Sequence, residues 1–429
     1  MNRYLFFFSR LLAVIVSVVI SISLFSRGLA LRAVLSTVLL LMFIITSFLF
    51  EEKRRKITVS YIFVFFNLFI TNTLVASFYS LDNIPNLYHD DKLAGLIGDY
   101  YSLYFTVVFI CYLVVITYLL CAKKKVLTTH TLEMSKGETK SFLLGALALM
   151  CAYVILGNSI DILVPMVATL ICLLVLQNKY RIICLVLLVM FWAFDTRLIS
   201  QRYILIGTML PVVFGFLICY CKNRKVSTFK MTLVVFLLFA CVMLYGIVSE
   251  IVKLKLYYGG NYTLAQVFGN TSLLFEFIYG QIYRIFVIWY KLGGYAIFHV
   301  KNFGFFYGIT YLKSFADVLG FEYVSLPKLV ASYHGSNYAQ PGLLAEGYAN
   351  FGIIGAVLNI CIVFFVMEYF YHRYYRNPSC ANFLLMTVPF STILLDGGTL
   401  NSAILAILVT IILCNLSLVV NKKKGIRLY

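Results

Sequence analysis

Long apolar runs, separated by short polar segments, make up most of this chain. A transmembrane α-helix needs ~20 mainly apolar residues to cross the hydrocarbon core of a bilayer. On that rule we expect twelve spans, at 5–24, 32–50, 57–78, 101–121, 141–156, 162–177, 182–194, 203–220, 231–249, 342–367, 381–395 and 401–420. Three of these runs, 141–156, 182–194 and 381–395, fall short of that length. The pattern predicts an all-α, polytopic integral membrane protein.

The polar segments between the runs alternate in charge. With the N-terminus inside, the inner loops carry the basic clusters EEKRRK (51–56), KKK (123–125), NKYR (178–181), CKNRK (221–225), HRYYR (372–376) and NKKKGIR (421–427). The outer segments hold basic and acidic residues in about equal numbers. The formal net charge of +18 is therefore a positive-inside signal, with both termini cytoplasmic, and nucleic acid is not needed to explain it.

Composition supports the membrane interpretation. The chain is 62% hydrophobic and 12% charged, with a mean hydropathy of +0.93, and a soluble domain cannot bury that much apolar surface. None of the eleven cysteines falls in a predicted outer loop, and no CxxC pair occurs. This disfavours a metal or redox site. No motif for a nucleotide-binding loop, a zinc protease or a serine hydrolase is present.

One extramembrane segment, 250–340, is large enough to have structure of its own. It lies between the ninth and tenth predicted spans, within what we expect to be a single integral membrane domain over 1–429. Its stretch 273–292 is apolar but interrupted by Glu276 and Arg284. We interpret this stretch as a helix against the membrane surface. A re-entrant segment or an additional span are the alternatives.

The large loop leads into the stretch Ser336–Leu358. Pro341 favours the first turn of a helix. Ala345, Ala349, Gly352 and Ala356 then recur at helical spacing and predict one smooth face for a neighbouring helix. Glu346 and Asn350 share an adjacent face, so a carboxylate is expected where the loop enters the bilayer. Such a charge is costly and often functional; the alternative is a solvated first-turn charge beside a packing face.

This stretch resembles the C-terminal signature of bacterial O-antigen polymerases, the Wzy-type enzymes that polymerise lipid-linked oligosaccharide repeat units. The matching positions are Pro341, Glu346, Tyr348, Asn350, Phe351, Gly352 and Gly355. The motif covers about two dozen positions, and the predicted topology extends the likeness to the rest of the chain.

Arginines offer candidate phosphate ligands, because a guanidinium donates to phosphate in a planar fork. Arg197 and Arg202 lie in a short predicted outer turn, and the resemblance implies a functional arginine at the start of the following span. Arg284 lies in the large loop beside Trp289 and Lys291, and polymerases of this type resemble the chain in having functional arginines in such a loop. Interface anchoring and snorkelling are the structural alternatives.

Just before the signature, His334 and Tyr338 offer a base near neutral pH and a sugar-stacking ring. A solvated loop histidine is the simpler interpretation. His299, also in the large loop, has no acidic or cysteine neighbour in the sequence.

The resemblance implies a metal-independent glycosyltransferase without a cofactor, in the bacterial inner membrane. A growing glycan would move from its undecaprenyl diphosphate to the non-reducing end of a new lipid-linked unit, with a chain-length regulator protein as a further partner. We expect Arg202 and Arg284 to stabilise the leaving diphosphate, and Glu346 or His334 to accept the hydroxyl proton. The expected substrate contacts are Arg197, Tyr338, Tyr348, Asn350 and Lys291. A flippase or exporter of the same units, or an O-antigen ligase, are the alternative functions.

Overall fold

The computed structural model describes parts of 100–114, residues 136–155, 160–176 and 181–194, most of 240–255, and residues 262–282, 288–312, 323–334, 339–377 (except 340), 379–395 and 400–422. Every regular element within these ranges is helical, which confirms the all-α prediction. The predicted spans 5–24, 32–50, 57–78 and 203–220 lie outside the described residues.

Five of the predicted runs correspond to observed helices. The runs 141–156, 162–177 and 182–194 correspond to α6 (Lys136–Ile155), α7 (Ile160–Leu176) and α8 (Arg181–Phe194). The last two runs correspond to α18 (Cys380–Leu395) and α19 (Leu400–Lys422). The described residues between Tyr100 and Val114 are helical as well.

The described parts of the large loop are mainly helical. It contains α12 (Leu264–Gly269), α13 (Thr271–Ile282), α14 (Ile288–Phe303), the 3₁₀ turn η5 (Ile309–Leu312) and α16 (Leu326–His334). Thr263 and Gln266 form a capping box that fixes the start of α12. The helix expected over 273–292 corresponds to α13 and the start of α14, which continues beyond that stretch to Phe303. Residues 283–287, with Arg284, lie outside the described residues.

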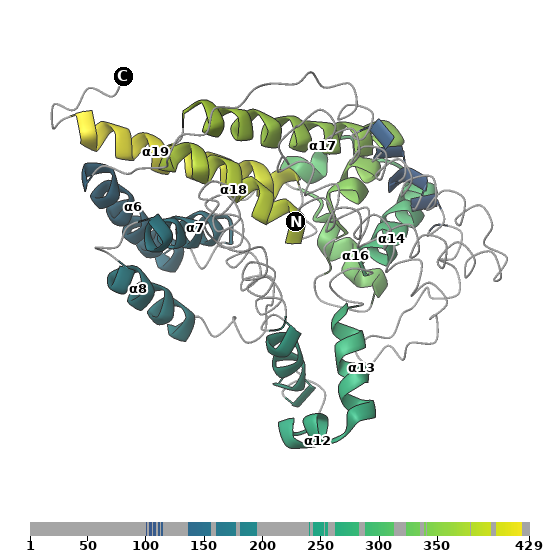
Figure 1. Ribbon diagram of the computed structural model, residues 1–429. Helices are drawn as coiled ribbons and strands as arrows, with labels where there is room; N and C mark the ends of the chain where they lie inside the picture. The colour runs from purple at the N-terminus through teal and green to yellow at the C-terminus, as the bar shows by residue number, and fades with distance from the viewer. Residues whose placement is uncertain are drawn as a thin grey trace, which may run out of the picture. The chain divides into compact units, whose positions relative to one another are not determined.

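Contacts divide the chain into two compact units. The first contains 1–126, 283–368 and 399–401, and the second contains 127–282, 369–398 and 402–429. In the second unit, α7 packs against α6, α8 and α18 (Figure 1). The helices approach closely where side chains are small: a Cβ added to Gly145 of α6 would overlap Leu413 of α19.

The helix α17 (Leu343–Arg376), whose residues up to Glu368 belong to the first unit, is not one continuous helix. Its backbone leaves helical geometry at Phe351 (φ −143°, ψ 23°) and Gly352 (φ 66°, ψ −150°). A positive φ is accessible to glycine without steric cost, so Gly352 is where the reversal can occur. The expectation that Ala345, Ala349, Gly352 and Ala356 form one continuous face is therefore wrong, because the face changes direction at the break.

Several helices expose apolar faces. On α17 the exposed side chains recur every three or four residues, at Phe351, Ile354, Leu358, Ile362, Phe365 and Tyr369. On α19 the exposed series is Ile404, Leu408 and Ile412, whereas Asn359 and Glu368 of α17 are buried. A helix at the surface of a soluble protein has the opposite pattern.

Within the described residues, one helix, Leu343–Tyr374, is long and apolar enough to cross a membrane. The part after the break, from Ile353 to Tyr374, measures about 33 Å at 1.5 Å per residue, so it alone matches the ~30 Å hydrocarbon core.

Candidate functional site

The two parts of α17 fold against each other as a hairpin, which we call the signature hairpin (Leu343–Asn359). Gly347 and Gly355 face each other across it: a Cβ on Gly347 would lie 2.7 Å from the Cα of Ala356, and one on Gly355 would lie 2.9 Å from the carbonyl carbon of Gly347. The Asn359 amide donates to the Leu343 carbonyl (3.0 Å), although in a straight helix residues sixteen apart are separated by about 24 Å. Close backbone contact therefore requires glycine at both positions.

Glu346 lies inside the signature hairpin, with 1% of its surface exposed. Its carboxylate Oε2 accepts a hydrogen bond from the backbone N–H of Leu400 at 2.7 Å. Leu400 is the first residue of α19, and helix N-termini present unsatisfied N–H groups and a partial positive charge. The carboxylate thus holds the start of α19 against the hairpin. This arrangement gives the charge a structural role.

A turn rich in aromatic residues, Phe303–Leu312, docks on the same hairpin; we call it the aromatic turn. Its Phe306 N–H donates to the Ala349 carbonyl (3.0 Å) and its Gly308 N–H donates to Asn350 Oδ1 (2.8 Å). Gly304, Tyr307 and Gly308 all have positive φ, which bends the chain sharply enough to present these N–H groups.

Asn350 is the centre of this docking contact. It is fully buried, and its amide nitrogen donates to Thr310 Oγ1 (2.6 Å) and to the Glu346 carbonyl (2.8 Å). Its side-chain oxygen and both amide hydrogens are thereby used within the protein. These contacts give Asn350 a structural role. Its role in substrate binding stays a prediction.

Tyr311 extends the polar cluster to the second arm of the hairpin. Its hydroxyl donates to Asn359 Oδ1 at 2.8 Å. Burial and, to a smaller extent, the nearby charge of Glu346 raise the pKa of Tyr311 to about 12, although hydrogen bonds to Asn359 and Asn350 oppose the shift. The hydroxyl therefore stays protonated and remains a donor throughout the physiological range.

Replacing Asn350 with alanine is expected to release the aromatic turn. The substitution leaves the Gly308 N–H and the Thr310 hydroxyl without this partner. Each buried group left unsatisfied lowers the free energy of unfolding by about 1–3 kcal/mol. The matched control is Asn302→Ala, since the exposed Asn302 amide donates to the Phe298 carbonyl of its own helix. Thermal unfolding in detergent should show a lower Tm for Asn350→Ala alone; equal Tm values for both variants would contradict the assignment.

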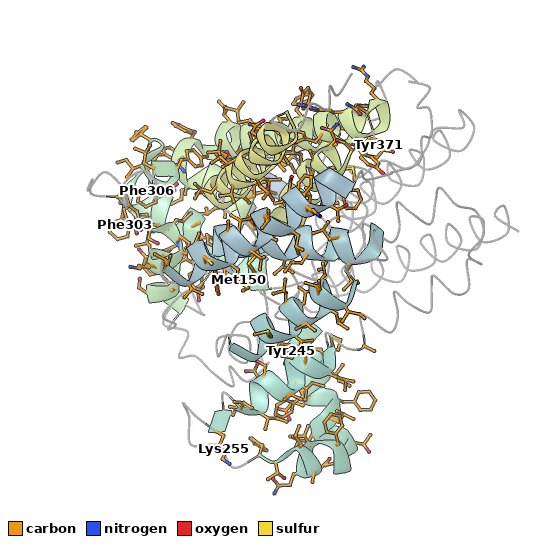
Figure 2. The ribbon with its side chains drawn as sticks, turned by 90° about the vertical axis from the view of Figure 1, so that its left-hand side faces the viewer. Met150, Tyr245, Lys255, Phe303, Phe306 and Tyr371 are labelled. Carbon is orange, nitrogen blue, oxygen red and sulfur yellow. The ribbon has the colours of Figure 1, made fainter. Side chains whose placement is uncertain are left out.

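A histidine is held among aromatic rings next to the aromatic turn. His299 Nδ1 shares a hydrogen bond of 2.7 Å with the Tyr333 hydroxyl of α16. Its ring stacks on Phe306 (5.0 Å, 6°) and on Phe303 (4.8 Å, 28°), and both phenylalanines are labelled in Figure 2. Tyr333 in turn stacks on Tyr295. Burial lowers the pKa of His299, which favours the neutral imidazole.

The described residues bring together part of the predicted site. Glu346, Tyr348 and Asn350 lie on the first arm of the signature hairpin, and Tyr348 is buried with its ring 6.5 Å from Phe305. Arg197, Arg202, Arg284 and Tyr338 lie outside the described residues, as do the side chains of His334 and Lys291. No group of three His, Cys, Asp or Glu side chains that could hold a metal occurs in the described part.

Sequence reasoning set His299 aside for lack of a neighbouring partner, and it missed Tyr311 and Asn359. Tyr333 is 34 residues from its histidine, and Tyr311 is 48 residues from its asparagine, so no local spacing reveals either pair. The available signal was an unusual density of aromatic residues around His299, in the run FHVKNFGFFY.

Comparison with known proteins gives one match. A family model described as "Family of unknown function (DUF6032)" matches residues 1–425. No curated protein and no solved structure matches the chain.

Proposed function

The chain belongs to the DUF6032 family, and we propose that it is an integral membrane glycosyltransferase of the polymerase type. It transfers a growing glycan from undecaprenyl diphosphate to the non-reducing end of a lipid-linked repeat unit, at the periplasmic face of a bacterial inner membrane. One observation carries the proposal: the stretch that resembles the polymerase signature folds into a buried polar hairpin, whose carboxylate and amides organise the start of α19 and the aromatic turn.

The exposed apolar faces support a membrane environment. An unbroken series of exposed Phe, Ile, Leu and Tyr along α17 is unfavourable in water and suited to lipid acyl chains. The last turn of α17 carries Arg373 and Arg376, which agrees with a cytoplasmic end under the positive-inside rule. The twelve-span topology, with both termini cytoplasmic, is part of the proposal.

The position of the helix break favours a polymerase over a flippase or exporter. Transporters typically bind substrate at broken helices near the bilayer midplane. Here the arm after the break is about 33 Å long and crosses a whole bilayer by itself, so the break belongs at the outer surface. The polar cluster of the hairpin then lies at the level where a lipid diphosphate and its sugars meet the protein.

The chemical roles follow from the charges required. Arg202 and Arg284 stabilise the diphosphate as negative charge develops on the leaving group. The energy of the glycosyl–diphosphate bond drives the transfer, so no nucleotide or metal is required. The expected substrate contacts, Arg197, Lys291 and Tyr338, complete the proposed pocket, and a chain-length regulator protein is the expected partner.

Deleting the gene is expected to leave lipid A core capped with a single repeat unit. Lipopolysaccharide gels and mass spectrometry measure the number of repeats, and wild-type protein restores the ladder whereas Arg202→Ala and Arg284→Ala do not. Arg3→Ala, near the N-terminus, is the matched control. A deletion strain whose core carries no repeat at all would contradict the proposal, because that phenotype belongs to a flippase or a ligase.

A further inference from the structure

The pair formed by His299 and Tyr333 is a second polar site in the large loop. The ring of His299 is only partly buried, and no hydrogen bond to its Nε2 atom is found among the described residues. The hydrogen bond at Nδ1 and stacking on Phe303 and Phe306 fix the ring plane. A histidine that is fixed through Nδ1, and whose Nε2 has no hydrogen bond within the described residues, has the arrangement required of a general base.

The surroundings suit a sugar. Phe303 is 69% exposed although it stacks on His299, and Tyr307 of the aromatic turn is also exposed. Exposed aromatic side chains beside a polar group commonly bind pyranose sugars. The C–H bonds of the sugar pack against the aromatic ring, and its hydroxyls reach the polar group. The same turn docks on the signature hairpin through the Phe306 N–H. The pair is thus connected to the signature hairpin through the aromatic turn.

We propose that His299 is the base that accepts the proton of the acceptor sugar hydroxyl, with Tyr333 as its positioning residue. The inference rests on the proposed function. The hydroxyl O–H bond breaks and its proton passes to Nε2, while the oxygen forms the new glycosidic bond to C1 of the donor. The C1–O bond to the diphosphate breaks, and its electron pair leaves on the diphosphate oxygen. The Nδ1–H donates to the Tyr333 oxygen throughout, which stabilises the imidazolium.

Two other candidates fit this step less well. Glu346 is almost fully buried and its carboxylate accepts the Leu400 N–H, so it is engaged within the fold. His334, predicted from the sequence, lies at the last residue of α16, next to Tyr333. His299 is the one with a described partner that orients its ring.

Among the charged and titratable groups described on α14 and on the elements near it, Tyr333 is the one that contacts His299. The others are Tyr100, Tyr295, Lys301, Tyr307 and Lys328. None of the latter shares a hydrogen bond, ion pair or ring contact with His299 within the described residues. Because burial lowers the pKa of His299, the reactive neutral form is retained until the pH falls below the ordinary histidine value of 6.5.

The test uses the full chain in lipid nanodiscs, with lipid-linked repeat units extracted from a strain that lacks this protein. His299→Asn keeps an amide at the Nδ1 position that can still bond Tyr333, but it has no base. We expect its initial rate of polymer formation to fall about 10²–10⁴-fold, without an acidic limb in the pH–rate profile and with unchanged binding of the lipid-linked units. Tyr333→Phe should lower the rate less and move the acidic limb to lower pH, because the imidazolium loses its acceptor.

His130→Asn, in a predicted inner loop, is the matched control and should retain the wild-type rate and profile. Each variant is required to elute as a single species and to melt near the wild-type temperature. A His299→Asn enzyme that keeps the wild-type rate and acidic limb overturns the inference and leaves the polymerase proposal intact. A wild-type protein that binds the units but never joins them overturns the polymerase proposal, and the inference with it.

Discussion

Gly347→Ala is expected to prevent the signature hairpin from closing. In an ordinary helix, alanine is more favourable than glycine by about 0.5–1 kcal/mol. Here the added Cβ would overlap the Gly355 carbonyl and lie 2.7 Å from the Ala356 Cα. These are backbone atoms, which cannot rotate away as a side chain can. We therefore expect a destabilisation of about 3 kcal/mol or more, the upper part of the range for overpacking.

Gly280→Ala is the matched control, because it makes the same change in a helix where nothing lies within 4 Å of the new Cβ. It should leave the Tm unchanged or slightly raised. Thermal unfolding followed by size-exclusion fluorescence in detergent measures both variants. If Gly347→Ala melts at or above the wild-type temperature, the two arms do not pack backbone to backbone as described.

Glu346→Ala and Glu346→Gln are expected to differ strongly. Alanine leaves the Leu400 N–H without the acceptor that lies 2.7 Å away, and it removes the charge beside the N-terminus of α19. Losing a buried hydrogen bond to a charged group costs about 1.5–3 kcal/mol. Glutamine keeps a side-chain carbonyl that can accept the same N–H, so most of the stability should remain.

Activity separates the structural role of Glu346 from a catalytic one. We expect Glu346→Gln to restore the polymer ladder in the deletion strain and Glu346→Ala to fail, as measured on lipopolysaccharide gels with protein levels matched by immunoblot. A folded Glu346→Gln protein that forms no polymer would indicate a catalytic role for this carboxylate. It would also remove the reason for preferring His299.

Helix positions could be predicted from the sequence because apolar runs and basic clusters are local signals. The bounds of α7, α8, α18 and α19 lie within two residues of the predicted runs at most ends. The place of Glu346 where the large loop meets a helix also followed from its position at the start of an uncharged run, whereas its burial did not, because a solvated first-turn charge fitted the same sequence. Such features depend only on the composition of neighbouring residues along the chain, so a single sequence is enough to predict them.

The hairpin could not be predicted in the same way. Small residues spaced three or four apart are typical of a continuous helix face, and Gly352 fits that pattern as well as any other small residue. Its left-handed conformation becomes favourable only because Gly347 and Gly355 permit the arms to touch and because Asn359 closes on Leu343. These contacts depend on tertiary structure, and so does the pairing of His299 with Tyr333.

The hydrogen bond between Glu346 and Leu400 has a consequence for biosynthesis. The two residues are 54 positions apart, so Leu400, the donor, is synthesised well after the hairpin that contains Glu346, the acceptor. The contact of Asn359 with Leu343 can form as soon as that short segment emerges. The carboxylate, however, stays without its backbone donor until α19 has been made. Insertion of α19 is thus the step that completes the folding of a segment translated much earlier.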